Sequence, residues 1–525
     1  MRRLALWAIP VAFLGFFFVY PVVTIIGRGL WPGGHLDLSP VADVVTNPSL
    51  RSVLWFTVWQ AAVSTVLTLL VALPTAFVLA RLRFRGRSLV RALMTVPFVL
   101  PTVVVASSFR ALGFDTSIVA ILLAHVFFNV AVVVRTVGGL WSHLDPRQED
   151  AARVLGANRL RVFTSITIPA LRPAILAAAS IVYLFCFTSF GVILILGGSG
   201  RATLETEIFR QATQLNLPTA AALSIAQLLA TVAMLVVAGR LQGRRDVAMD
   251  LQPAIETARP IRGRGDRALL IGVLGSAAVL LGTPIAVLIV RSFDTGTGFG
   301  FGFYRALSSL RADSVLFVPP VEAIGNSLLY ATAATVLALL VGGPAAFAVA
   351  RSRRGGTLDV VLALPLGVSA VMVGFGFLIA FDPPVDLRSS WVLVPIAHAL
   401  VGIPFVVRIA VPVIRSIDPR LREAAAVLGA SPRTIWREVD LPVAARGLMV
   451  GAGFAFAISL GEFGATAFIA RPDRPTLPVV VFRLLGQPGA QNFGAAMAAS
   501  TILVVLTVAA MLGIERLRAS ELGAF

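Results

Sequence analysis

The sequence predicts an all-α polytopic membrane protein of about twelve transmembrane helices, arranged as two parallel six-helix repeats. First, 57% of the 525 residues are apolar and only 13% are charged, whereas about 25% are charged in an average soluble domain. Second, continuous apolar runs, each long enough to cross a bilayer, recur along the chain. Because these runs do not alternate with polar residues, they indicate helices and not the strands of a barrel. Third, the two halves of the sequence resemble each other.

Short polar connections separate the predicted spans. The basic residues are all arginine, and they gather in alternate connections, such as RLRFRGRSLVR (81–91) and RSRRGG (351–356). The positive-inside rule places these connections, and both termini, in the cytoplasm. The net charge of +18 therefore follows from membrane topology, and no nucleic-acid partner is expected. The approximate spans are 5–28, 53–80, 89–112, 117–141, 170–196, 218–240, 268–291, 326–350, 358–381, 391–413, 443–469 and 491–513.

The chain repeats itself once. TVLTLLVALPTAFVLAR (65–81) matches TVLALLVGGPAAFAVAR (335–351), and TLETEIFR (203–210) matches TLPVVVFR (476–483). We expect a first repeat over 1–242, a polar cytoplasmic linker over 243–266 and a second repeat over 267–525. Each repeat holds an even number of spans, so both point the same way and are related by a pseudo-twofold axis along the membrane normal.

A polar helical segment also occurs twice, at 145–165 and 418–438. Each copy opens with an Asp-Pro pair, carries an acid in its first turn and has a glycine six residues after that acid. Since alanines expose little side chain and the glycine lets the chain turn, each copy predicts a compact cytoplasmic knob. The alternative is an ordinary interfacial helix, which would have one strong apolar face. The matched positions are Asp150, Ala151, Ala152, Gly156 and Pro169 in the first copy and Glu423, Ala424, Ala425, Gly429 and Pro442 in the second.

This pattern resembles the permease subunits of binding-protein-dependent (type I) ABC importers, and the chain looks like two such subunits fused. The resemblance covers both halves, although Asp150 stands where the family pattern has glutamate. It implies that the two segments are coupling helices and that the matched positions contact the ATPase. The implied partners are two ABC ATPase subunits, an extracytoplasmic substrate-binding protein and the lipid bilayer, in a bacterial plasma (inner) membrane.

The resemblance further implies that the chain is a permease and not an enzyme. ATP would be used by the partner subunits, and this chain would bind no cofactor or metal of its own. A chain without lysine cannot contain a Gly-x-x-x-x-Gly-Lys-Ser/Thr phosphate loop. Fused permeases of this kind are typical of thiamine and ferric-iron importers, and stretches such as SLGEFGATAFIARPDRPTLPVVVFRLLG (459–486) look most like the thiamine type.

Four residues are candidates for the translocation pathway. Glu462 lies inside a span, where a carboxylate usually faces a cavity or a partner, and its equivalent in the first half is Ser189. It either faces a cationic cargo, or it pairs with a neighbouring helix or caps a helix break near Gly461 and Gly464. Phe190 and Phe463 occupy equivalent places before a glycine, where they either gate the pathway or pack.

Other polar residues allow two interpretations each. His125 and His398 are equivalent, and such histidines either ligate a metal or, more often, bond a neighbouring helix. The loops GGSGRATLE (197–205) and ARPDRPTLP (470–478) are either contacts for the binding protein or plain connectors. A secondary transporter could also show parallel repeats, but it would not need paired docking helices. A membrane enzyme is disfavoured, since no paired catalytic carboxylates or Ser/His/Asp grouping is evident.

Overall fold

The computed structural model describes residues 2–31, 34–198, 200–242, 257–261, 263–310, 314–352, 362, 364–365, 368–382 and 386–522. Almost every element in this part of the chain is a helix, and three short π-helical turns (η1, η3 and η4) join consecutive helices. Two strands of two residues each pair in parallel, with Leu82 opposite Arg259. The structure thus confirms the predicted all-α polytopic class.

The first half of the chain contains seventeen described elements. They are α1 (Arg2–Leu14), η1 (Gly15–Val19), α2 (Tyr20–Leu30), α3 (Ser39–Thr46), α4 (Pro48–Arg81), β1 (Leu82–Arg83), α5 (Arg87–Leu93), α6 (Val96–Val99), α7 (Thr102–Ala111), α8 (Ile118–Trp141), α9 (Arg147–Val154), α10 (Arg159–Val162), η3 (Phe163–Thr167), α11 (Ile168–Phe187), α12 (Gly191–Leu196), α13 (Leu204–Thr213) and α14 (Leu217–Gln242).

The second half repeats much of this order. Its described elements are β2 (Arg259–Pro260), α16 (Arg264–Phe293), α17 (Gly302–Ala306), α18 (Glu322–Arg351), α20 (Ala370–Ala380), α21 (Leu393–Arg415), α22 (Pro419–Val427), α23 (Pro432–Ile435), η4 (Trp436–Asp440), α24 (Leu441–Gly461), α25 (Thr466–Ile469), α26 (Leu477–Leu485) and α27 (Ala490–Leu522).

Ten of the twelve predicted spans coincide with helices long and apolar enough to cross a membrane among the described residues, but those of 170–196 and 443–469 end early, at Phe187 and Gly461. The third, at 89–112, is instead broken between α6 and α7, whose axes differ in direction by 99°. The break falls at Leu100, whose backbone is extended because Pro101 follows it. The ninth predicted span, 358–381, is described mainly at α20, since 353–361, 363, 366 and 367 lie outside the described residues.

The first helices of the two halves are exchanged in the packing. Helix α1 packs on α18, and α2 packs on α14 and α20. The hydroxyl of Tyr20 donates to the carbonyl of Ala380 at 3.1 Å, which ties α2 to the second half. In return, α16 packs on α4 and α7 of the first half. The predicted sequence halves, 1–242 and 267–525, are therefore interlocked and do not form two separate bodies.

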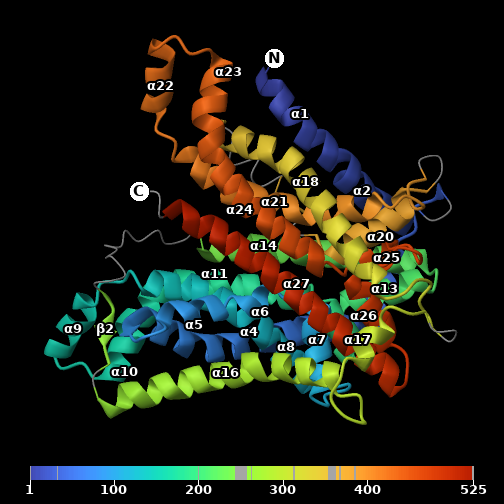
Figure 1. Cartoon of the computed structure of the whole chain (residues 1–525), viewed down its shortest axis with the longest axis horizontal. Helices are drawn as coiled ribbons and strands as arrows, with labels where there is room; N and C mark the ends of the chain where they lie inside the picture. Colours follow the sequence, from blue (N-terminus) through green and yellow to red (C-terminus); the bar gives the residue numbers. More distant parts are fainter. Residues whose placement is uncertain are drawn as a thin grey trace.

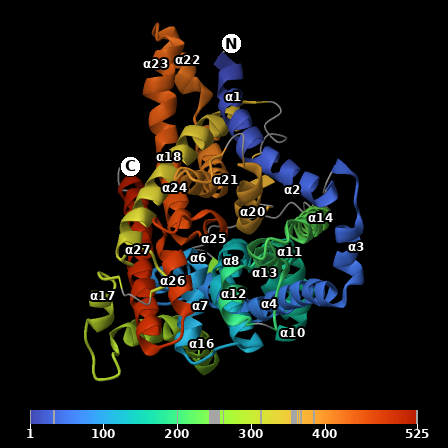
Figure 2. The ribbon, with the colours of Figure 1, turned by 90° about the vertical axis from the view of Figure 1, so that its right-hand side faces the viewer.

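Two helical knobs project from the same end of the molecule, which we call the knob end. Figure 1 shows α22 and α23 at the upper left and α9 and α10 at the lower left. Figure 2 shows the α22–α23 knob projecting above α18 and α24, with the N-terminal end of α1 at a similar height. Most of the predicted linker (243–256 and 262) lies outside the described residues, but β2 pairs with β1 beside the α9–α10 knob.

Candidate functional site

Each knob is a helix, a sharp turn and a second helix. Asp145 and Asp418 open the knobs, because their carboxylates accept hydrogen bonds from the backbone N–H of Arg147 and Arg420, both at 2.9 Å. These bonds satisfy donors that the first turn of a helix leaves free. The second helix of each knob continues through η3 or η4 into α11 or α24.

The glycine of each knob has a left-handed backbone conformation, which turns the chain between the two knob helices. Gly156 has φ +84° and Gly429 has φ +83°. Beyond each glycine, a backbone N–H reaches back five residues: Ala157 donates to Ala152 at 3.0 Å, and Ala430 to Ala425 at 2.9 Å. This is the geometry of a Schellman helix end, which favours glycine at the left-handed position.

The tips of the knobs expose apolar side chains. Val154 and Leu155 are each 88% exposed, and their equivalents Val427 and Leu428 are 88% and 86% exposed. Sequence reasoning singled out the alanines and acids and missed this pair, although its recurrence at the same offset of 273 could have revealed it. An apolar pair that is exposed at two equivalent tips indicates a surface for a partner.

The remaining predicted knob residues lie around these tips. Asp150 and Glu423 are exposed in the structure, and Asp150 forms an ion pair with Arg153 at 2.8 Å. Ala151 and Ala424 are exposed, whereas Ala152 and Ala425 are half-buried. Pro169 and Pro442 are the second residues of α11 and α24, directly after η3 and η4, within helices that continue from the knobs.

The two halves also meet through a stack of phenylalanines, at the breaks that follow α11 and α24. The rings of Phe190 and Phe463 lie 5.4 Å apart with planes 24° from parallel. Phe209 packs against the first ring at 5.4 Å, and its equivalent Phe482 packs against the second at 5.3 Å. Contact between equivalent residues is what a pseudo-twofold axis between the halves requires.

A glycine follows each stacked phenylalanine because a helix of the same half approaches it closely. A Cβ at Gly191 would lie 2.6 Å from Thr102 Oγ1, and one at Gly464 would lie 3.0 Å from the Cβ of Ala370. These contacts join the breaks after α11 and α24 to the starts of α7 and α20. The Phe-Gly pairs are thus positions where two interrupted helices touch.

A cavity of about 330 Å³ lies between the halves next to this stack. All four predicted pathway residues line it: Ser189, Phe190, Glu462 and Phe463. Its wall is largely apolar and aromatic, and the phenylalanines that line it are Phe98, Phe128, Phe185, Phe190, Phe405, Phe454 and Phe463. A concave apolar pocket with a few polar groups is the usual form of a small-molecule site.

The carboxylate of Glu462 caps the break that follows α24. One oxygen accepts from the backbone N–H of Ala465 at 2.8 Å, and the other accepts from the N–H and hydroxyl of Thr466 at 3.1 and 2.5 Å. This is the geometry of the capping alternative. The same side chain also lines the cavity. In this conformation Glu462 therefore lies at the cavity wall while its oxygens bond to Ala465 and Thr466.

The two equivalent histidines are held by hydroxyl groups. His125 hydrogen-bonds with Ser64 at 3.0 Å and with Ser189 at 2.9 Å. His398 hydrogen-bonds with Ser459 and Thr466, both at 2.7 Å, and its Nε2 lies 3.1 Å from Glu462. Each imidazole thus has a neighbouring side chain at both nitrogens. Within the described ranges, no three His, Cys, Asp or Glu side chains group as metal ligands would.

Sequence reasoning missed a second carboxylate at the cavity. Glu205, at the start of α13, lines the cavity and accepts a hydrogen bond from Ser369 of the second half at 2.9 Å. Gln227 of α14 donates to its other oxygen. The sequence placed Glu205 in an outer loop, but Thr203 and Thr206 form a capping box that begins a helix there.

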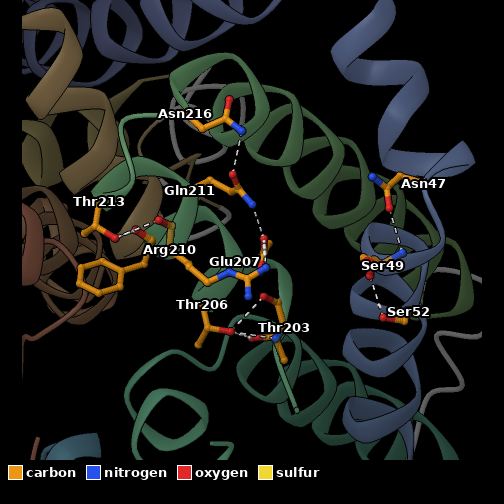
Figure 3. A network of polar contacts seen from close by, with 11 residues as sticks. Asn47, Ser49, Ser52, Thr203, Thr206, Glu207, Arg210, Gln211, Thr213 and Asn216 are labelled. Carbon is orange, nitrogen blue, oxygen red and sulfur yellow. Dashed lines mark hydrogen bonds and ion pairs between the residues drawn. The ribbon is translucent and has the colours of Figure 1, made fainter. Parts of the chain in front are cut away.

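A polar network holds α13 in place, as Figure 3 shows. Glu207 accepts from Arg210 at 2.7 Å and from Gln211 at 2.6 Å, and Asn216 donates to Gln211 at 2.9 Å. These bonds fix the helix at its second turn and at the turn that follows it. These bonds stabilise α13 itself, and Glu205 is held against other elements by its hydrogen bonds to α14 and to the second half.

The loop 470–478, at the end of the molecule away from the knobs, is ordered by its own charges. Arg471 donates two hydrogen bonds to Asp473, at 2.9 and 3.0 Å, and a third to the carbonyl of Ser389 at 2.6 Å. The bonds from Arg471 lower the pKa of the Asp473 carboxyl below its usual range. Both side chains are partly exposed, so the loop presents a fixed, charged surface at this end.

Comparison with known proteins decides the family. The pattern of the family described as the binding-protein-dependent transport system inner membrane component matches residues 72–245 and again residues 334–518. The chain belongs to this family. The two matches account for the repeat and for the presence of a knob in each half, and members of the family are multi-pass components of an inner membrane transporter.

Relatives of the same length carry a more specific name. The chain is 28% identical over 521 residues to a thiamine transport system permease protein of Brucella abortus, covering 94% of this chain and 92% of the relative. It is 27% identical over 496 residues to the Escherichia coli protein of the same description, covering 88% of each. A sulfate transport system permease protein of Salmonella typhimurium is 33% identical over 221 residues, which is 38% of this chain and 80% of that protein.

Proposed function

We propose that this permease is the membrane subunit of an ATP-driven importer that passes thiamine from a substrate-binding protein to the cytoplasm. The observation that carries the proposal is the pair of knobs. Both have the same glycine turn and the same exposed apolar tip, at Val154 and Leu155 and at Val427 and Leu428. Two equal docking surfaces at one end of the molecule suit a partner that is present in two copies.

The partners at the knobs are two ABC ATPase subunits, so the knob end faces the cytoplasm. Burying a valine or leucine that was exposed contributes about 1.5–3 kcal/mol, so each tip can supply a large part of a docking energy. ATP is bound and hydrolysed on those subunits, and the permease needs no cofactor of its own. ATP can drive the halves apart or together only if closed ATPases favour one of the two arrangements.

The cargo enters at the opposite end, where the binding protein docks near the loops 197–205 and 470–478. The stack of Phe190 on Phe463 lines the cavity and joins the two halves in this conformation. Tilting the halves would separate the two rings, because they belong to different halves. The stack is accordingly the gate, and the cavity beside it is the resting place of the cargo.

The walls of the cavity favour an organic cation. Glu462 contributes a carboxylate, whereas burial raises the pKa of the Glu205 carboxyl to about 8, so that it is mostly protonated at neutral pH. Aromatic rings occupy much of the remaining surface. A cation near aromatic faces gains about 0.5–2 kcal/mol, and the Glu462 carboxylate adds attraction. Thiamine is cationic, and it is the cargo in the names of relatives that match nearly the whole chain. Sulfate, named for one shorter relative, would be repelled by the Glu462 carboxylate.

Ferric iron is the second candidate, since it is also a cation that an acidic cavity attracts. The direct test is uptake of labelled thiamine and, separately, of ferric iron, in cells with and without the gene for this chain. Loss of thiamine uptake alone supports the proposal. Loss of iron uptake alone would replace the cargo and leave the importer class intact.

A separate measurement tests the energy source. The permease is purified with a tag, and the proposal expects an ABC ATPase to copurify and to hydrolyse ATP faster when the loaded binding protein is added. Thiamine uptake that persists when that ATPase is absent, but collapses with the proton or sodium gradient, would identify a secondary transporter instead.

A further inference from the structure

Three segments meet at the base of each knob: the end of a long helix, the first knob helix and the π-helical turn that leads to the next span. In the first half, Glu149 of α9 accepts a hydrogen bond from the Thr167 hydroxyl of η3 at 3.0 Å. Its carboxylate also lies 3.4 Å from the guanidinium of Arg81, at the end of α4. One carboxylate on the knob thus binds both of the other segments.

The second half joins the same three segments with different residues. Here the carboxylate belongs to Asp440 of η4, and it accepts a hydrogen bond from Arg422 of the knob helix α22 at 2.7 Å. Its other oxygen forms an ion pair with Arg351, at the end of α18. We name each of these groups a knob clamp, made of residues 81, 149 and 167 in the first half and 351, 422 and 440 in the second.

The clamps occupy equivalent positions with the charges rearranged. Arg81 corresponds to Arg351 at the offset of 270 that aligns α4 with α18. At the knob offset of 273, Glu149 corresponds to Arg422 and Thr167 corresponds to Asp440. The acid has moved from the knob helix to the π-helical turn, and a basic residue has taken its former place. Both halves therefore have a contact between these two positions, although the residue types at both positions differ.

Each knob clamp contains a buried charged side chain, unlike an ion pair on the surface. The side chains of Arg81 and Asp440 are only 6% and 3% exposed, so neither charge can turn to water if its partner is removed. Each clamp also crosses between separate segments, unlike the exposed pair of the neighbours Arg437 and Glu438. Arg81 further donates to the carbonyl of Leu144, just before the knob, at 3.0 Å.

We propose that the knob clamps hold each knob rigidly on its half, so that motion of a docked ATPase is transmitted to the spans. The residues act by positioning the knob and not by touching the cargo or the ATPase. This role rests on the proposed function, since it assumes that the knobs receive the ATPases. Without the clamp, a knob could follow its ATPase while the spans stay behind, and ATP would be hydrolysed without transport.

The experiment moves the first half's arrangement into the second half. Purified permease is reconstituted in vesicles with its ATPase and binding protein, and labelled thiamine taken up per ATP hydrolysed is measured. Arg422→Glu alone places two acids together, and Asp440→Thr alone leaves two arginines without their acid. We expect each single variant to lower the ratio about fivefold or more, and the double variant to recover to within about twofold, as coupled positions do.

Two further measurements make the result decisive. Arg437→Thr also imports the first half's residue, Thr164, into the knob but outside the clamp, and it should leave the ratio unchanged. Amide hydrogen exchange of α22 in the purified permease should quicken in both single variants and return in the double variant, whatever the cargo is. This readout separates failure of the clamp from failure of the proposed function.

The clamp is overturned if either single variant keeps both the parent ratio and the parent exchange, or if the double variant is no better than the worse single variant. If the parent neither retains an ATPase nor takes up thiamine, the proposed function fails. In that case the exchange data alone decide whether the clamp holds the knob.

Discussion

The two halves of the molecule are closely similar at the knobs but differ at the walls of the cavity. The knobs have the same turn, with φ +84° at Gly156 and +83° at Gly429, and the same exposed tips. In the cavity, Glu205 has Pro478 as its equivalent and Glu462 has Ser189. A surface that meets the same kind of partner twice must have the same shape twice. A cavity that holds one cargo without twofold symmetry has no such requirement.

The largest effect is expected at the tips of the knobs. Two double variants carry aspartate at a tip, one at Val154 and Leu155 and the other at Val427 and Leu428. Each should abolish ATPase copurification and reduce thiamine uptake to the level of cells without the permease. Charges cannot enter an apolar pocket of a partner without a large cost. Because the tips are equivalent, the two double variants should be equally inactive.

The control for this prediction is Leu215→Asp, which changes a side chain that is 82% exposed but lies just after α13, away from the knobs. It should retain the ATPase. Normal copurification with either pair of tip aspartates would show that the knobs are not the docking surfaces, and it would remove the main support for the proposed function.

The second effect concerns the glycine turns. Gly156→Val and Gly429→Val should each weaken ATPase binding about tenfold or more, since a left-handed backbone costs a non-glycine residue roughly 1–2 kcal/mol and a β-branched one more. Gly429→Asn should be tolerated, because asparagine adopts this backbone more readily. Titration of the ATPase onto immobilised permease measures the affinity of each variant. Equal affinities of Gly429→Val and Gly429→Asn would contradict the prediction.

The third effect tests the asymmetry of the cavity. Glu462→Gln should raise the thiamine concentration for half-maximal uptake, by about tenfold if the lost attraction is near 1.4 kcal/mol. Glu205→Gln should change it by about twofold or less, because burial raises the pKa of Glu205 to about 8 and little charge is lost. Copurification and ATP hydrolysis should not change, since neither residue is in a knob. An unchanged half-saturation in Glu462→Gln would mean that this carboxylate serves only the fold, as the hydrogen bonds of Glu462 to Ala465 and Thr466 already allow.

The smallest effect is expected at the gate. Phe190→Ala and Phe463→Ala should have similar consequences, because the rings contact each other across the pseudo-twofold axis. An aromatic pair contributes about 0.5–1.5 kcal/mol beyond its buried area, so ATP hydrolysis without binding protein should rise a few-fold. The double variant should add little to either single variant. Full additivity would show that the two rings act independently.

The sequence by itself predicted the class, the repeat and the knobs. Apolar runs of bilayer length are a local property, and so are the Asp-Pro start and the glycine six residues after the acid. The equivalence of Phe190 and Phe463, and of Ser189 and Glu462, followed from aligning the two halves. Each of these features depends on residues close together in the chain or on direct self-comparison, so no knowledge of packing was needed.

Only the tertiary structure decided which helices are neighbours. In a membrane, nearly every span is apolar on all sides, so composition does not tell a lipid-facing surface from a buried one. The exchange of α1 and α2 with α16 was invisible for that reason, and so was the bond from Ser369 to Glu205. The rearranged charges at positions 149, 167, 422 and 440 became meaningful only when the fold placed them around Arg81 and Arg351. Long-range packing, which no local pattern encodes, sets these contacts.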